Sequence, residues 1–155
     1  VQSGLVKPVL TARSLDEVLP IAVAGYPPGA VSLAVEESVP LVRTDAGLLE
    51  RVVANLVANA VRVSGAKPVR VLAHVLPTTV EILVVDQGPG VPPVQRERMF
   101  EPFQRLDDVS PGGLGLGLAV ARGLTEALDG ELSAEDTPGG GLTMVLSVPR
   151  AASAP

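Results

Sequence analysis

Two neighbouring apolar runs constrain the fold of this chain more than any other feature. VRVLAHV (residues 69–75) and TVEILVV (residues 79–85) are rich in β-branched residues, and a short turn-forming segment around Pro77 connects them. Runs of this length and spacing predict two antiparallel strands joined as a hairpin. The second run leads directly into DQGPG (residues 86–90), so the sequence predicts a sheet in which one strand ends in a carboxylate.

The flanking segments predict helices and further strands. Ser14 and Glu17 have the spacing of a capping box and predict a short helix in SLDEVLPIAVAG, whereas the alternation in AVSLAVEE predicts a strand. Towards the C-terminus, LGLAVARGLTEAL predicts a helix with Gly130 as its C-terminal cap, and ELSAED and LTMVLSV predict a closing hairpin around TPGGG. Because helices and paired strands interleave without regular βαβ units, we expect an α+β two-layer sandwich.

Composition excludes several classes of protein. Hydrophobic residues make up 46% of the 155 residues, which is enough for the core of one domain. A formal charge of −5 and an aromatic content of 2% argue against a nucleic-acid binder, which needs a basic field and stacking surfaces. The chain has no cysteine, which fits a reducing compartment, and no apolar run approaches the length of about 20 residues needed to span a membrane. We therefore expect a cytoplasmic location, without direct membrane contact.

A polar stripe runs along the longest predicted helix, residues 46–63, which either Thr44 or Asp45 can cap. Its members are spaced by four, four and three residues and so share one face: Arg51, Asn55, Asn59 and Arg62. One interpretation is a solvated face. However, asparagine is a mediocre helix former, so two asparagines one turn apart indicate amides that face a ligand or a metal. Amide oxygens are hard donors suited to Mg²⁺, which also takes phosphate oxygens and water as ligands.

Asp86 also has two interpretations. As the first residue of DQGPG it is an ordinary turn former. At the end of a buried strand, however, a carboxylate must accept hydrogen bonds, and the neighbouring glycines let a flat ligand approach the backbone closely. An exocyclic amine is a suitable donor for such a carboxylate.

A glycine-rich segment, GGLGLGLAV (residues 112–120), leads into a helix whose N-terminal amides and dipole favour an anion such as phosphate. The dinucleotide-binding fingerprint is excluded, because Gly113, Gly115 and Gly117 are evenly spaced and follow a loop. The P-loop is excluded as well, because neither lysine of the chain follows a glycine loop.

Four motifs occur in a distinctive order: NLVANAVR, DQGPG, FEPF and GLGLGLAV. Over residues 14–149 this arrangement resembles the ATP-binding catalytic domain of sensor histidine kinases, in the superfamily that also contains gyrase, Hsp90 and the MutL proteins. The C-terminal part is most similar to the Kdp-type, potassium-responsive sensor kinases of actinobacteria. The resemblance implies a Bergerat-type fold, with a mixed sheet packed on helices. It also implies that residues 1–13 lead in from a preceding domain and that residues 150–155 form a disordered tail.

The resemblance further implies ligands, namely ATP and Mg²⁺, and residue roles. Asn59 would hold the metal, Asp86 would accept a hydrogen bond from the adenine amino group, and Arg62 would face phosphate. Asn55 and Arg105 would complete the catalytic group, with Arg105 near the γ-phosphate. The other implied nucleotide contacts are Gly88, Gly90, Phe100, Phe103, Gly113, Gly115, Gly117, Leu118 and Thr143.

The two phenylalanines would anchor a mobile ATP lid at residues 104–116, which nucleotide would order. The chain departs from the family at Arg62 and Val63, where Lys-Tyr is frequent, so an aromatic neighbour of the base is lost. Asn55 stands in the place of the water-activating glutamate of gyrase-like ATPases, and an amide cannot act as a general base. The resemblance therefore implies slow hydrolysis of ATP.

The phosphate-accepting histidine of these kinases lies on a preceding dimerisation domain, and the histidine of this chain, His74, is expected in a strand. The implied partners are ATP, a dimerisation domain of the same protein and a response regulator, in the cytosolic part of a membrane-anchored sensor. The alternatives are a gyrase- or Hsp90-like ATPase, an anti-sigma-type serine kinase of the same superfamily, and a non-catalytic interaction domain that has lost its nucleotide.

Overall fold

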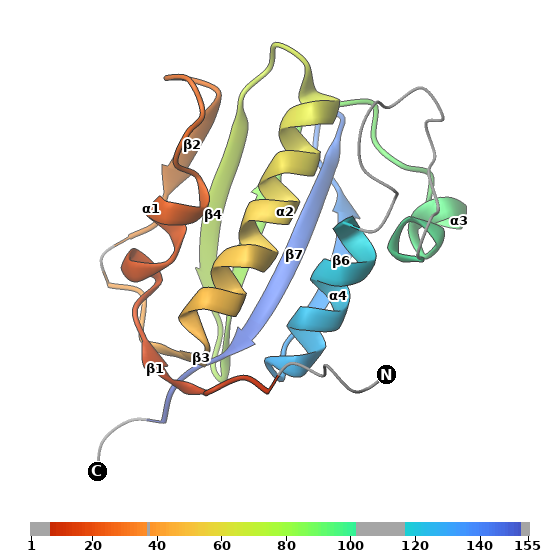
Figure 1. Cartoon of the computed structure of the whole chain (residues 1–155). Helices are drawn as coiled ribbons and strands as arrows, with labels where there is room; N and C mark the ends of the chain where they lie inside the picture. Colours follow the sequence, from red (N-terminus) through yellow and green to blue (C-terminus); the bar gives the residue numbers. More distant parts are fainter. Residues whose placement is uncertain (1–6, 37, 102–116, 153–155) are drawn as a thin grey trace.

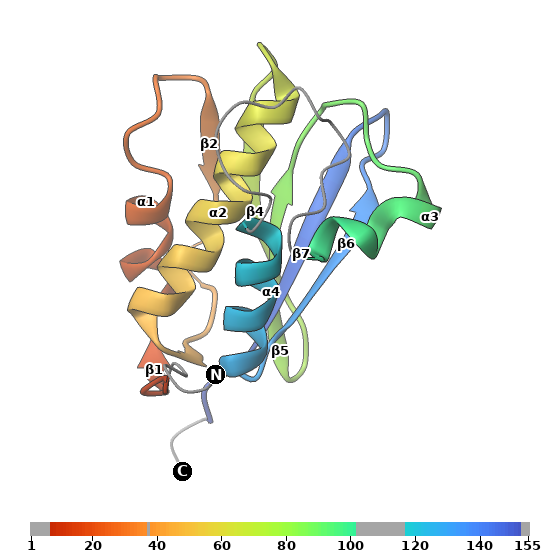
Figure 2. The same cartoon turned by 45° about the vertical axis from the view of Figure 1, so that its right-hand side comes forward.

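The computed structural model describes residues 7–36, 38–101 and 117–152 (Figure 1). Its main sheet has five strands in the order β2-β4-β5-β7-β6, and helices cover one face of that sheet (Figures 1 and 2). The strands are β2 (Val31–Ala34), β4 (Val69–Val75), β5 (Thr79–Val85), β6 (Glu131–Asp136) and β7 (Leu142–Pro149). The helices are α1 (Leu19–Ala22), α2 (Ala46–Ser64), α3 (Pro93–Arg96) and α4 (Gly117–Ala127), with 3-10 turns η1 (Leu15–Glu17) and η2 (Arg98–Phe100). This arrangement confirms the predicted α+β two-layer sandwich.

Most pairing in the main sheet is antiparallel. β4 and β5 form the predicted hairpin, with Arg70 opposite Val85 and Val75 opposite Val80, and β6 and β7 form the closing hairpin. The sheet is mixed because β2 runs parallel to β4, and α2 lies on the connection between them. The mixed sheet confirms what the resemblance implies, although no local pattern predicts this crossover, because a short strand, β3 (Val42–Thr44), intervenes before the helix.

Helix α2 begins where Asp45 caps it. The Asp45 side chain accepts a hydrogen bond from Leu48 N at 3.2 Å, whereas Thr44, the alternative cap, ends strand β3. The buried face of α2 belongs to the core of the domain and consists of Leu49, Val52, Val53, Leu56, Val57 and Ala60. Burial of each larger apolar side chain contributes about 1.5–3 kcal/mol. This packing holds α2 against the sheet and thereby positions the polar residues on its other face. Within the described parts of the chain, no helix has both the length and the apolar character to cross a membrane.

The C-terminal end of α4 differs from the prediction by one residue. Asp129 has a φ of 61° and takes the left-handed position, while Gly130 N donates to the Thr125 carbonyl at 2.9 Å, as in a Schellman motif. Gly130 is required for another reason, because a Cβ there would lie 2.5 Å from the carbonyl oxygen of Ser147 on β7. The glycine allows the turn to pack closely on the sheet, and the aspartate, which tolerates a positive φ, ends the helix.

The predicted N-terminal helix is divided in two. Ser14 and Glu17 form the expected capping box, in which Ser14 N donates to Glu17 Oε1 at 3.1 Å. The turn that follows is the 3-10 turn η1, and α1 begins separately at Leu19 with Pro20 in its first turn. Proline lacks a backbone N–H and is tolerated at the start of a helix, so a new helix begins there instead of the first one continuing.

Hydrogen bonds join both predicted end segments to the rest of the domain. Strand β1 (Thr11–Arg13) lies in the predicted lead-in, yet it pairs antiparallel with β3, and Val9 N donates to Asp45 Oδ2 at 3.0 Å. In the predicted tail, Arg150 and Ala151 each donate a backbone hydrogen bond of 2.9 Å to another part of the chain. These bonds join segments far apart in the sequence, so no local pattern indicated them.

Candidate functional site

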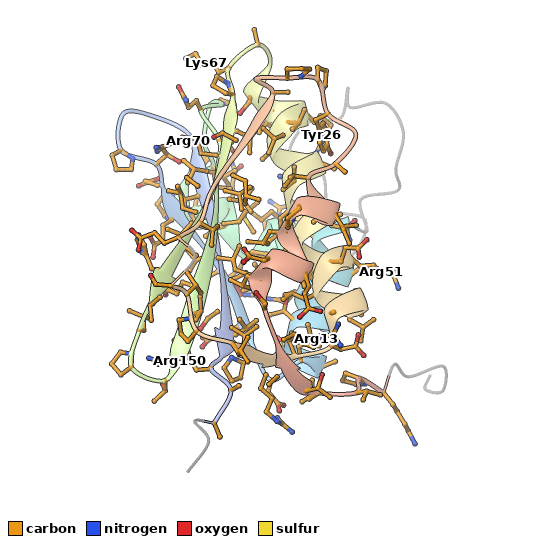
Figure 3. The ribbon with its side chains drawn as sticks, turned by 90° about the vertical axis from the view of Figure 1, so that its left-hand side faces the viewer. Arg13, Tyr26, Arg51, Lys67, Arg70 and Arg150 are labelled. Atoms are coloured by element: carbon orange, nitrogen blue, oxygen red, sulfur yellow. The ribbon has the colours of Figure 1, made fainter. Side chains whose placement is uncertain are left out.

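The structure confirms the polar stripe on α2. Arg51 and Arg62 are exposed, and Asn55 and Asn59 are partly buried beside the apolar face. Arg51 extends from α2 on the side away from the sheet (Figure 3). Towards the C-terminal end of the helix, Arg62 Nη2 donates a hydrogen bond to Asn59 Oδ1 at 2.7 Å. The amide oxygen predicted to bind a metal is therefore already paired with a cation.

Asp86 is a buried carboxylate at the end of β5, with 2% of its surface exposed. Its Oδ1 accepts two backbone hydrogen bonds of 2.9 Å, from Gly88 N and from Leu142 N. The first bond closes the turn that Asp86 starts, and the second ties this turn to β7. The turn-forming interpretation is thus confirmed, and it uses one carboxylate oxygen: among the described residues, no donor is bonded to Oδ2.

The Asp86 turn lies against the C-terminal end of α2. A Cβ at Gly88 would lie 2.6 Å from the carbonyl oxygen of Val63, so a larger residue there would displace the turn. The backbone N–H that follows Asp86 donates to the Ser64 hydroxyl at 3.1 Å. Asn59 lies one helical turn before Val63 on the same flank of α2, so Asn59 and the Asp86 turn face one region.

Gly141 makes the tightest contact of this region, although the sequence predicts only a hairpin turn at TPGGG. Its φ is 114°, and a Cβ there would lie 2.2 Å from the carbonyl oxygen of Asp86. Gly90 has a φ of 78°, and its Cβ position would lie 3.3 Å from the carbonyl oxygen of Gly141. The run of three glycines was the available signal, since only glycine adopts such φ values freely and allows backbones to meet this closely.

Thr143 does not lie on the face of the sheet that meets the helices. Its neighbours Leu142 and Met144 belong to the core on the helix side of the sheet, so strand alternation places Thr143 on the opposite face with Val145. The Thr143 hydroxyl is hydrogen-bonded to that of Thr137 at 2.9 Å, and both residues are buried. The predicted contact of Thr143 with adenine is therefore not supported.

Phe100 belongs to the core, with 6% of its surface exposed, and η2, which contains it, lies against α4. The guanidinium of Arg122 on α4 lies 4.1 Å from the centroid of the Phe100 ring. Arg122 also donates to both carboxylate oxygens of Glu97, at 3.2 and 3.1 Å, and this pairing lowers the pKa of Glu97 below its ordinary value. The cation–π contact and the bidentate ion pair hold η2 on α4, and the sequence did not reveal them because the partners lie on separate elements.

Helix α4 lies beside α2 and runs in the opposite direction, so it begins beside the middle of α2 and its first turn points toward the end of the molecule where α2 ends (Figures 1 and 2). Gly117 and Leu118 form the first turn of α4, where backbone N–H groups favour an anion. The remaining predicted site residues and the predicted lid lie outside the described residues: Phe103, Arg105, Gly113, Gly115 and residues 104–116.

The described residues offer few donors for a metal. Within residues 7–36, 38–101 and 117–152, no three His, Cys, Asp or Glu side chains come together in a way that could hold a metal ion. Asn59 offers a hard amide oxygen, and Asn55 lies one turn earlier on the same stripe. This donor set fits a Mg²⁺ ion that takes its other ligands from phosphate and water, and it does not fit an ion held by protein side chains alone.

Residues 44–152 match the family of histidine kinase-, DNA gyrase B- and HSP90-like ATPases. The match covers more than half of the chain and includes α2, the Asp86 turn and α4, so the chain belongs to this family. More narrowly, its sequence and fold are those of the ATP-binding catalytic domain of sensor histidine kinases, as the following relatives show.

Among curated proteins, the chain is similar to the sensor protein KdpD of Rathayibacter rathayi, with 44% identity over 156 residues that cover 99% of this chain. It is 42% identical to KdpD of Mycobacterium tuberculosis over 155 residues, or 94% of this chain. In each case the chain spans 18% of the relative's length.

Among solved structures, full-length ShkA in complex with AMPPNP matches with a TM-score of 0.79 and 27% identity, over 96% of this chain and 33% of that one. The mycobacterial sensor histidine kinase MprB matches with a TM-score of 0.74 and 27% identity, over 94% of this chain and all of that one. These relatives confirm the resemblance that the four sequence motifs indicated.

Proposed function

We propose that this domain binds MgATP between the C-terminal half of α2, the Asp86 turn and the start of α4, and presents the γ-phosphate to a histidine on a neighbouring dimerisation domain. The buried carboxylate of Asp86 carries this proposal. Its Oδ1 is held by Gly88 N and Leu142 N, and no described residue donates to Oδ2. The amino group of adenine supplies the missing donor, and a hydrogen bond to a buried charged group contributes more than one between neutral groups.

Other residues of the site bind the metal, the phosphates and the rest of the base. Asn59, with Asn55 one turn away, holds Mg²⁺, and Arg62 and the first turn of α4 bind phosphate. Gly88 and Gly90 let the base lie close to the backbone. Bound Mg²⁺ would neutralise charge on the triphosphate. The residues of the chain itself align the γ-phosphate for attack, so catalysis depends on positioning and electrostatics.

Calorimetric titration with MgATP tests the metal role. We expect the parent domain to bind MgATP with micromolar to millimolar affinity and Asn59→Ala to bind it more weakly. Alanine is the better helix former, so the substitution should leave α2 intact. Binding of MgATP by Asn59→Ala as tight as by the parent would show that Asn59 does not hold the metal.

Labelling with radioactive γ-phosphate tests the transfer. The domain alone should remain unlabelled, whereas an added dimerisation domain with its histidine should become labelled. The reason is position: His74 is exposed on β4 and shares the sheet face of Leu72, opposite the helices. It is therefore not within near-attack range of a nucleotide bound beside α2. Label on His74 that survives base and is lost in acid would contradict this assignment.

The wider assembly belongs to the same proposal. By its similarity to KdpD, we assign the domain to a potassium-responsive, membrane-anchored sensor kinase that passes phosphate to a response regulator. Asn55 favours transfer over hydrolysis, because an amide cannot activate water as a general base. Steady-state hydrolysis of ATP by the domain alone should accordingly be slow compared with labelling of the dimerisation domain.

A further inference from the structure

The hydrogen bond between Arg62 and Asn59 joins two residues that the proposed function assigns to different parts of the ligand. Arg62 Nη2 lies 2.7 Å from Asn59 Oδ1, and the two residues are three positions apart on α2, where side chains are neighbours. Arg62 is exposed and Asn59 is partly buried. The guanidinium thus occupies the oxygen that would bind Mg²⁺, and the amide occupies the side chain that would bind phosphate.

Bound MgATP destabilises this pairing. A guanidinium keeps its positive charge in proteins, and it is repelled by a divalent cation on the same oxygen. Rotation of the Arg62 side chain away from Asn59 relieves this repulsion. A triphosphate supplies the reason to rotate, because hydrogen bonds from arginine to phosphate are charge-assisted on both sides and frequently bidentate, whereas the amide oxygen is neutral.

We propose that the Arg62–Asn59 hydrogen bond is a latch that makes the metal and the nucleotide bind as one unit; this rests on the proposed function. Without nucleotide, each residue masks the other. The phosphates draw Arg62 away and uncover Asn59 Oδ1 for Mg²⁺, so each ligand raises the affinity for the other. Free Mg²⁺ therefore meets an Asn59 oxygen that is bonded to Arg62, and metal-free nucleotide meets an Arg62 side chain that is bonded to Asn59.

Titration of the domain with ATP in the presence of EDTA tests the latch. If Asn59 only held the metal, Asn59→Ala would have no effect on metal-free ATP. With the latch, Asn59→Ala removes the hydrogen bond that holds Arg62 beside the metal oxygen, and metal-free ATP should bind about threefold to tenfold more tightly than to the parent, the size of one modest hydrogen bond. The same substitution should weaken the binding of MgATP, so its effect changes sign with the metal.

Two further variants show whether the gain passes through Arg62. Asn55→Ala removes an amide from the same stripe, one turn earlier, and should produce no gain in EDTA, because Asn55 is not the partner of Arg62 in the hydrogen bond. In an Arg62→Met background, Asn59→Ala should also produce no gain, since the guanidinium that bonds to Asn59 is absent. The four affinities of this double-mutant cycle give the coupling between the two residues.

The outcomes separate the latch from the proposed function. If metal-free ATP binds Asn59→Ala no more tightly than the parent, or if the gain persists in the Arg62→Met background, the latch is wrong while the MgATP site stands. If the parent does not bind MgATP at all, both are wrong. Thermal unfolding without nucleotide confirms that each variant is folded.

Discussion

Replacement of Asp86 by asparagine tests base recognition with little change in shape. The asparagine Oδ1 can still accept the bonds from Gly88 N and Leu142 N, which are both 2.9 Å long in the parent. The second oxygen, however, becomes an NH₂ group. This donor would meet the amino donor of adenine, so we expect the fold to survive and the affinity for ATP to fall.

The magnitude follows from the bonds concerned. A hydrogen bond to a charged group contributes about 1.5–3 kcal/mol. Its loss corresponds to a fall in ATP affinity of about tenfold to a hundredfold. The two backbone bonds to Oδ1 also lose charge assistance, and this weakening should lower the free energy of unfolding of the nucleotide-free variant by about 1 kcal/mol.

The assay is calorimetric titration of the parent and Asp86→Asn with MgATP and with MgGTP, with thermal unfolding of each protein as the control for folding. GTP presents a carbonyl where ATP presents an amino group, so the parent should bind GTP poorly, and the difference between the two nucleotides should narrow in the variant. Equal affinities of the parent for ATP and GTP, or an unchanged ATP affinity in Asp86→Asn, would refute the base-recognition role.

Two other predictions concern stability. Gly141→Ala should lower the free energy of unfolding by about 2 kcal/mol or more, because it combines a φ of 114° with a Cβ 2.2 Å from the Asp86 carbonyl oxygen. In denaturant unfolding, Gly139→Ala is the matched control, since it has a φ of 88° and nothing within 4 Å, and equal losses in both variants would show that the contact itself is unimportant. Asp45→Ala should cost about 1 kcal/mol through loss of the helix cap, and it should also change the pH dependence. Backbone hydrogen bonds, above all the one from Val9, hold the pKa of Asp45 below its ordinary value of 3.8. The carboxylate therefore contributes stability above that value, and this contribution is lost as pH falls through the lower pKa of the folded state. Acid unfolding of the parent should be steeper than that of Asp45→Ala, and identical pH profiles would contradict this linkage.

Local chemistry allowed much of the fold to be predicted. The cap at Asp45 and the box of Ser14 and Glu17 depend on residues within one helical turn of each other, and the β4–β5 hairpin depends on two adjacent apolar runs. The turn at Asp86 could also be predicted from local sequence, because its closing hydrogen bond comes from Gly88, only two residues away.

Features that depend on tertiary contacts could not be predicted in the same way. Gly141 is required by a backbone 55 residues earlier in the chain, and Arg122 pairs with a carboxylate 25 residues away. The sheet face on which Thr143 lies could not be predicted for a different reason. Alternation is visible in the sequence of β7, but which of its two faces meets the helices is decided by pairing with β5 and β6.

Through its two carboxylate oxygens, Asp45 links the segment before β1 to the start of helix α2. Oδ2 accepts the bond from Val9 at 3.0 Å, and Oδ1 accepts the bond from Leu48 in the first turn of α2. A pulling force on the chain before Val9 therefore loads this carboxylate and the β1–β3 ladder first. The helix behind it has 19 residues and is about 28 Å long. Since Asn59 lies near its far end, tension would detach β1 and fray the start of α2 before it strained the nucleotide site.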